Sequence, residues 1–176
     1  MLKSLLAFVI ALLMGFGQAA NVATASSNID GEEIRAFDFG YNGAPQGDRQ
    51  SGPYSVVFTN TQSPITDPYG FHEIIFVRLG AGHQRASKAQ IIVQLDLVLA
   101  AFGRGENPIC PTCFFDYVAG AAFGGPGTTT TSVGPDFMTP GPVLLLRGRY
   151  AYLCAIPELD GTPHYKLGML GTFWAK

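Results

Sequence analysis

The stretch that decides the fold lies near the end of the chain, at residues 149–169, with the sequence RYAYLCAIPELDGTPHYKLGM. Its first part is typical of a β-strand, in which alternate residues share a face, so Tyr152 and Cys154 should point the same way. A loop containing proline and glycine then returns the chain to His164, and Met169 follows at the start of a closing strand. The pattern therefore predicts a thiolate, an imidazole and a thioether in one place.

These three side chains make up most of one set of metal ligands. A blue-copper centre uses two histidines and one cysteine in a trigonal plane, with a weak axial methionine. Cys154, His164 and Met169 provide three of the four, so the second histidine must come from another part of the chain. Each has an ordinary alternative as a packed core residue, but their order and spacing together favour the metal site.

Two further histidines, His72 and His83, are the candidates for the missing ligand. His72 enters the segment 71–79, which is almost continuously apolar, as in a central strand packed on both faces. Taken alone, His72 is better explained as a strand-end histidine that bonds to a backbone carbonyl. His83 lies in a glycine-rich loop and is expected to be solvated.

Composition limits the fold and the partners. The chain has 176 residues, 47% of them hydrophobic and only 14% charged, with a net charge of −2. A single domain of this size buries enough surface to fold without cross-links. Its 22 glycines and 12 prolines, together with Val-, Ile-, Phe-, Tyr- and Thr-rich segments, favour an all-β sandwich or barrel. No basic patch is present, so nucleic acid is not expected as a partner.

The first residues are typical of an export signal. Lys3 is followed by an apolar run that is shorter than the ~20 residues needed to cross a bilayer. We expect a signal peptide at residues 1–25 and one domain at residues 26–176. The mature protein is then a soluble monomer outside the cytoplasm, periplasmic or extracellular, without stable insertion into a membrane.

Several strands and one helix are expected along the chain. The first strand, at 34–41, should lie at a sheet edge and turn its aromatic residues, such as Phe37, toward the core. Ser87 and Gln90 form a capping-box pattern that begins a helix ending near Phe102. Residues 107–128 are expected to form a long loop. The other strands are expected at 53–60, 71–79, 128–133, 143–147, 150–155 and 167–175.

The chain has three cysteines, an odd number, so they cannot all pair with one another. Cys110 and Cys113 are close enough to form a disulfide or a redox pair. Cys154 is then left alone, and an unpaired cysteine in an exported protein needs a reason. Burial as an inert thiol is one reason, and ligation of copper is another.

Two blocks of the sequence resemble the cupredoxins. Residues 148–154, 163–164 and 168–173 look like the copper-binding loop near the cupredoxin C-terminus, and residues 54–60 and 71–76 are similar to the strand pair that presents the first histidine. The resemblance implies an all-β, Greek-key β-sandwich with an inserted α-helix. It also implies copper held by His72, Cys154, His164 and Met169. The chain departs from the pattern in its inserted segments and in the nine residues between Cys154 and His164.

The resemblance implies an exported type 1 copper protein that transfers single electrons to a redox partner protein, and no enzyme activity. His164 is then the ligand nearest solvent, within an apolar docking patch. One alternative is a copper carrier or buffer that serves a copper-handling protein, with Cys110, Cys113 and Met138 as a second Cu(I) site. Another is a metal-free interaction module that keeps the fold. The apolar docking patch around His164 is formed by Ile156, Leu159, Pro163 and Leu167.

Overall fold

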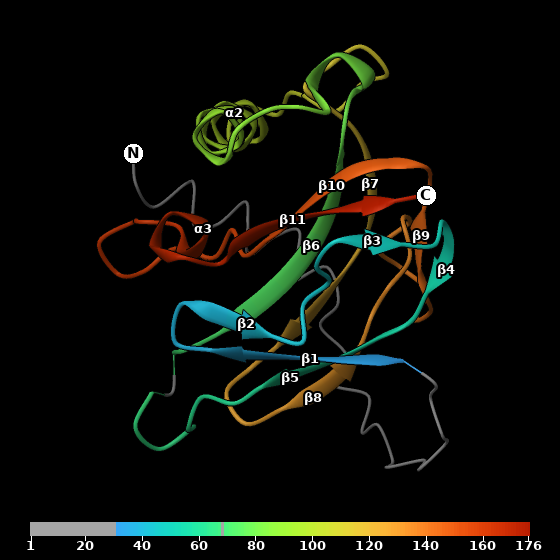
Figure 1. The fold of residues 1–176 in the computed structure, drawn as a ribbon. Coiled ribbons are helices and arrows are strands. Elements are labelled where there is room, and N and C mark those ends of the chain that lie inside the picture. The colour runs from blue at the N-terminus through green and yellow to red at the C-terminus, as the bar shows by residue number, and fades with distance from the viewer. Residues whose placement is uncertain (1–30, 68) are drawn as a thin grey trace.

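The computed structural model describes residues 31–67 and 69–176, so the expected signal peptide lies outside the described residues. The chain forms two β-sheets packed face to face, with one long helix on the outer side of the larger sheet (Figure 1). This architecture confirms the predicted all-β sandwich with one inserted helix. The elements are β1 (Glu32–Phe37), β2 (Gly40–Asn42), β3 (Asp48–Arg49), β4 (Gly52–Tyr54), β5 (Val56–Asn60), β6 (His72–Leu79), the 3₁₀ turn η1 (Ala81–His83), α2 (Lys88–Phe102), β7 (Phe115–Gly124), β8 (Thr129–Thr131), β9 (Val143–Leu145), β10 (Gly148–Leu153), α3 (His164–Leu167) and β11 (Leu170–Ala175).

The larger sheet carries the strands that present the predicted ligands. Its order is β3-β11-β10-β6-β7, and β10 is antiparallel to both of its neighbours. After the β6–β7 pair the chain crosses to β8 in the smaller sheet, of order β2-β1-β5-β8, and then returns to place β10 beside β6. This crossover gives the sandwich its Greek-key connectivity. Strands β4 and β9 form a separate short ribbon.

Side chains of β6 and β10 alternate between two cores. Phe76, Tyr152 and Cys154 face the space between the two sheets. Val77 and Leu153 face the opposite way, toward α2. This explains why β6 is apolar along most of its length, as predicted for a central strand, and it confirms that Tyr152 and Cys154 share a face. Burial of each large apolar side chain, such as Phe76 or Leu153, contributes roughly 1.5–3 kcal/mol to the free energy of unfolding.

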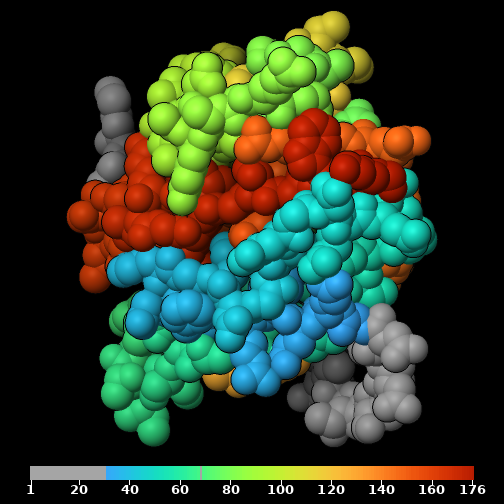
Figure 2. Space-filling model, viewed as in Figure 1, coloured from blue at the N-terminus to red at the C-terminus, as the bar shows by residue number. Residues whose placement is uncertain are grey.

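Helix α2 covers the outer face of the larger sheet, and Figure 2 shows its yellow-green residues beside the red and orange strands of the C-terminal half. The helix begins as predicted. The Ser87 hydroxyl accepts from the Gln90 N–H, and the Gln90 side chain accepts from the Ser87 N–H at 2.8 Å. Ile91 and Leu95 are buried against the sheet, which ties the helix to the sandwich.

The prediction for residues 34–41 is wrong in three respects. The segment forms β1 and β2, joined by a turn in which Asp38 has a φ of 35°, and β1 lies inside the sheet between β2 and β5. Ile34 and Ala36 are the fully buried residues, whereas Phe37 is 46% exposed. The space between the sheets accepts Ile34 and Ala36 rather than Phe37. Aspartate is among the few residues that tolerate a positive φ.

The expected loop at 107–128 contains β7, the longest strand of the structure among the described residues. This strand pairs with β6 along its whole length. Its middle has the sequence AGAA, which lacks the bulky and β-branched residues that mark strands. A bulge lies there, since Phe76 pairs with Gly120 and Val77 with Val118. Gly120 has a φ of 139°, and a Cβ at this position would lie 2.3 Å from the Val133 carbonyl oxygen, so the position requires glycine.

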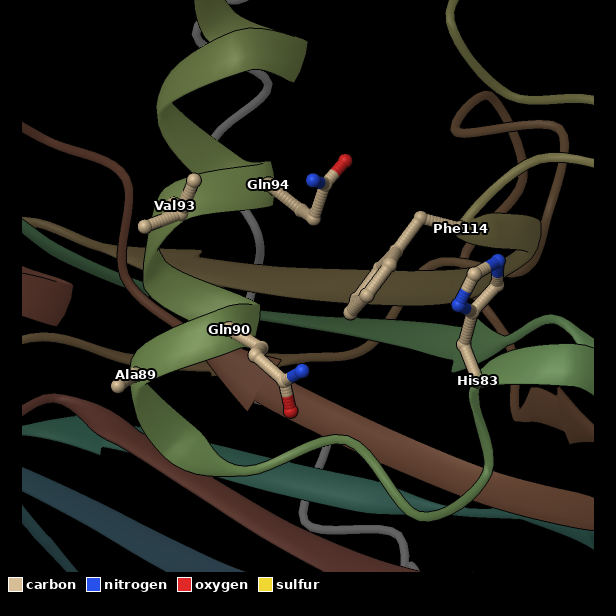
Figure 3. Close-up of a pocket in the computed structure, with 6 residues that line it drawn as sticks. All are labelled: His83, Ala89, Gln90, Val93, Gln94 and Phe114. Carbon is tan, nitrogen blue, oxygen red and sulfur yellow. The ribbon is translucent and has the colours of Figure 1, made fainter.

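An open pocket lies beside α2, where the rings of His83 and Phe114 are stacked 4.6 Å apart (Figure 3). His83 is therefore half-buried rather than solvated as expected. The pocket lies beyond Leu79, the last residue of β6, whereas His72 is the first residue of that strand. Since a strand rises about 3.3 Å per residue, the seven steps of β6 place Leu79 about 23 Å from His72, and His83 follows at the Leu79 end.

The capping box can be tested by mutation. Replacing Ser87 with alanine removes the oxygen that accepts from the first turn of α2, and we expect a loss of about 1 kcal/mol in the free energy of unfolding. Urea denaturation followed by far-ultraviolet circular dichroism measures this loss. Ser87→Asp keeps an accepting oxygen and should stay close to the parent. Equal losses in both variants would contradict the capping role.

Candidate metal centre

Pairing between β6 and β10 brings the first two predicted ligands together. The strands are antiparallel, with Leu153 opposite Ile75. His72 is the first residue of β6 and Cys154 follows the last residue of β10, so both lie at the same end of the sheet. The backbone N–H of Glu73 lies 3.5 Å from the Cys154 sulfur and donates to it, which joins the two strands at this point.

The third predicted ligand, His164, begins the one-turn helix α3 rather than the expected loop. Two backbone hydrogen bonds hold this turn against the end of β10: His164 N–H donates to the Ile156 carbonyl, and Tyr165 N–H donates to the Cys154 carbonyl at 2.9 Å. Gly168 ends the turn with a φ of 140°, and a Cβ there would lie 2.5 Å from the Phe39 carbonyl oxygen. Glycine at this position therefore permits the close contact between α3 and the β1–β2 turn.

The three side chains converge in the interior. The Nδ1 atoms of His72 and His164 are 3.2 Å apart, and the Cys154 sulfur lies 3.4 Å from the His164 Nδ1. The ligand atoms of all three residues lie within 4.8 Å of one another. His72 is 1% exposed, Cys154 0% and His164 3%. Segments far apart in the sequence thus bring three donor atoms to one buried point.

The distance between the two histidine nitrogens and the distance between Cys154 and His164 fit a metal ion. An ion that lies 2.0–2.3 Å from nitrogen and sulfur donors needs pairs of donors roughly 3.2–3.7 Å apart. Burial, with a smaller contribution from His164, lowers the pKa of His72 to about 4, so its imidazole is neutral and able to ligate. Two imidazoles, a thiolate and a nearby thioether form a donor set that suits copper.

The Cys154 thiol needs a cation to ionise in this setting. Burial raises the pKa of Cys154 well above its usual range, and the negative charge of Glu73 adds to the shift. The backbone N–H groups of Glu73 and Ile156 partly oppose it. Because a bound metal ion displaces the thiol proton, the site can hold a thiolate only together with its metal.

Glu73 is a site residue that sequence reasoning missed. Its side chain is buried next to His72 and accepts from the Ala155 N–H at 2.9 Å, which fastens the segment after Cys154 to β6. Tyr41 donates its hydroxyl to the Glu73 carbonyl. Burial raises the pKa of the Glu73 carboxyl to about 7, although the bond from Ala155 lowers it. A carboxylate at the start of a mostly apolar strand was the sequence feature that marked this position.

The nine-residue loop between the predicted cysteine and histidine ligands is ordered as a short hairpin. Pro157 pairs with Pro163, and the Glu158 N–H donates to the Thr162 carbonyl at 2.9 Å. The turn closes with a hydrogen bond from Gly161 N–H to the Glu158 carbonyl, and Gly161 has a φ of 88°. The long spacing therefore leaves His164 in a fixed position.

Met169 follows α3 and lies beside Cys154. Its carbonyl accepts from the Cys154 N–H at 3.1 Å, and its own N–H donates to the His164 carbonyl. The side chain is fully buried in the same core as Cys154. Met169 is thus held by hydrogen bonds to two of the three converging residues.

The two remaining cysteines take no part in this cluster. Cys110 and Cys113 form a disulfide with each other, which leaves Cys154 as a free, buried thiol. Met138 is exposed on the surface. Because the sulfurs of Cys110 and Cys113 are bonded to each other, the structure provides no thiolates there for a second copper ion.

His164 differs only slightly from His72 in exposure, so both imidazoles are shielded from water. In the expected docking patch, Leu159 is exposed and Leu167 is partly so. The Phe39 ring packs edge-on against the His164 ring, with centroids 5.5 Å apart, and is 42% exposed. An aromatic residue from the β1–β2 turn therefore lies between His164 and the surface.

Comparisons with known proteins find structural likeness alone. No protein-family model matches the chain, and no curated protein matches it. The chain is similar to auracyanin A, described as a "blue" copper protein from the green thermophilic photosynthetic bacterium Chloroflexus aurantiacus, with a TM-score of 0.47 and 15% identity over 82% of this chain and 96% of that one. It is also similar to an auracyanin from Roseiflexus castenholzii, with a TM-score of 0.44 and 18% identity over 82% and 94% of the two chains.

An azurin from the obligate methylotroph Methylomonas sp. strain J shows a TM-score of 0.39 and 12% identity, over 82% of this chain and 95% of that one.

The fastening role of Glu73 can be tested without metal. Glu73→Ala leaves the Ala155 N–H buried without an acceptor, and we expect a loss of about 1–3 kcal/mol in the free energy of unfolding. Glu73→Gln keeps an oxygen in place and should lose less. Denaturant titration of the metal-free protein measures both variants. A Gln variant as unstable as the Ala variant would show that the hydrogen bond is not what matters.

Proposed function

We propose that the chain is an exported member of the cupredoxin family, a type 1 copper protein that carries single electrons between partner proteins. The observation that supports this most directly is the convergence of His72, Cys154 and His164 on one buried point. Two imidazoles and one thiolate in this arrangement, with Met169 nearby, are the ligands of a blue-copper centre.

Copper bound here supplies a one-electron couple between Cu(I) and Cu(II). The chain's own residues hold the donors in one arrangement for both oxidation states. His72 is fixed by β6, Cys154 by its place after β10, and His164 by the backbone bonds of α3. Because the donors are set by the sandwich core and are shielded from water, little has to rearrange when an electron arrives or leaves.

We further propose that electrons enter and leave near His164. Its ring lies behind Phe39, and Leu159 and Leu167 add exposed apolar surface around it. A partner protein that docks on this surface approaches the metal through the aromatic ring and the imidazole. The distant pocket beside α2 has no role in this proposal.

The place of action follows from the first residues and the cysteines. The expected signal peptide at residues 1–25 directs the chain out of the cytoplasm, and the Cys110–Cys113 disulfide suits an oxidising compartment. Within residues 31–67 and 69–176, no helix is both long and apolar enough to cross a membrane.

Titration of the leader-free protein with Cu(II) tests the proposal. We expect an intense absorption in the visible range that saturates at one copper per chain, because the thiolate bonds directly to Cu(II). Cys154→Ser should abolish the band. His83→Ala, which alters a histidine far from the cluster, should leave it unchanged.

Other outcomes would favour the alternatives. Loss of copper on dialysis would favour a metal-free interaction module. Two Cu(I) ions per chain under reducing conditions would favour a copper carrier in which Cys110 and Cys113 also bind metal.

The role of Met169 gives a second test. Met169→Leu keeps the volume of the side chain, so the fold should tolerate it at a cost under about 1.5 kcal/mol. We expect the visible band to remain and the reduction potential to rise, since loss of a donor destabilises the more highly charged Cu(II) state. Protein-film voltammetry measures the shift, and Met138→Leu at the surface is the control. An unchanged potential in Met169→Leu would rule out the axial role.

A further inference from the structure

The two histidines of the cluster differ in what holds their outer nitrogens. The Nε2 atom of His72 is buried without a hydrogen-bond partner among the described residues. The Nε2 atom of His164 lies 2.7 Å from the Oε1 atom of Glu158. One imidazole is thus oriented by a carboxylate, and the other is oriented by its strand and the surrounding core.

Glu158 reaches this position because of the hairpin in the long loop. Its backbone N–H and carbonyl are both used, in hydrogen bonds to Thr162 and Gly161 at the base of the turn. The side chain is then directed back toward His164 rather than into solvent, although it remains 41% exposed. The hairpin between Cys154 and His164 therefore delivers a carboxylate to the outer nitrogen of the His164 ring.

We propose that Glu158 is a positioning residue for His164 and that this is what the long loop contributes to the site. The inference rests on the proposed function, since it assigns Glu158 to the copper centre. Glu158 accepts a hydrogen bond from the His164 ring and does not itself bind the copper.

The chemistry follows from what a carboxylate can do. A carboxylate only accepts hydrogen bonds, so the bond requires the proton of the neutral His164 ring to lie on Nε2. The lone pair of Nδ1 is then free, and Nδ1 is the atom that faces Cys154 and His72. Glu158 thereby selects the tautomer that binds metal, before any metal arrives.

The carboxylate also acts on the bound metal. A carboxylate that accepts from a ligating histidine raises the basicity of that ligand and fixes its ring, and loss of such a group typically costs 10–100-fold in metal affinity. A negative charge behind the imidazole favours Cu(II) over Cu(I). Glu158 should therefore strengthen binding of Cu(II) more than binding of Cu(I), and so lower the reduction potential.

Nitrogen-15 NMR of the histidine rings in the metal-free protein tests the tautomer directly. We expect His164 in the parent protein to carry its proton on Nε2. Glu158→Ala should give a mixture of tautomers, whereas Glu158→Gln, which keeps an accepting oxygen, should retain mostly the Nε2–H form. A merely structural role for Glu158 in the loop would leave the tautomer unchanged.

The matched control is Asp160→Asn in the same hairpin. Asp160 accepts from the Thr162 N–H at 2.8 Å and does not contact His164, and asparagine can keep that bond. This variant changes the net charge by the same amount as Glu158→Gln. It should leave the tautomer and the copper constants as in the parent.

Copper affinities give the second measurement. Competition titrations should show 10–100-fold weaker binding of Cu(II) to Glu158→Ala, with a smaller loss for Cu(I). Each tenfold difference between the two losses raises the reduction potential by about 59 mV. Affinities and a potential equal to those of the parent would overturn the proposal, as would an Nδ1–H tautomer in the parent protein.

The two measurements separate this inference from the proposed function. If the parent binds no copper but the NMR spectra show the expected tautomers, the function fails and the positioning of His164 by Glu158 stands. If the parent gives the blue band but Glu158→Ala matches it in tautomer and potential, the function stands and Glu158 has no part in it.

Discussion

The site depends on the antiparallel pairing of β6 with β10. This pairing fixes the register, with Leu153 opposite Ile75, and so sets His72 and Cys154 at the same end of the sheet. A slip of one residue would turn every side chain of a strand to the other face and send the cysteine toward α2 instead of the core between the sheets. The two separate cores oppose such a slip, because large apolar side chains fill both faces of the larger sheet.

Burial of two imidazoles and a thiol next to each other is unfavourable unless something compensates for it. In this chain the burial keeps the His72 imidazole neutral and the Cys154 thiol protonated before metal binds. A metal ion then satisfies three buried polar groups at once. The supporting hydrogen bonds come from Glu73, which fastens the strands, and from the hairpin at 155–163, which makes a long connection rigid.

Sequence reasoning reached the sandwich, the capped helix and the convergence of Cys154 with His164, because each leaves a local pattern of alternation, capping or spacing. It missed β7, whose small residues resemble a loop and whose identity as a strand comes from pairing with β6. It reversed the faces of β1, since the size of a side chain did not reveal which set fits between the sheets. The contact of Glu158 with His164 depends on how the loop folds, which no spacing in the sequence specifies.

One copper ion should bind where His72, at the start of β6, meets Cys154 and His164 near the end of the chain. The most direct measurement is a crystal structure of the copper-loaded protein, with anomalous diffraction collected at the copper absorption edge. We expect a single strong anomalous peak within bonding distance of His72 Nδ1, Cys154 Sγ and His164 Nδ1. Copper found elsewhere on the chain, or a Cys154 sulfur bonded to another cysteine, would contradict it.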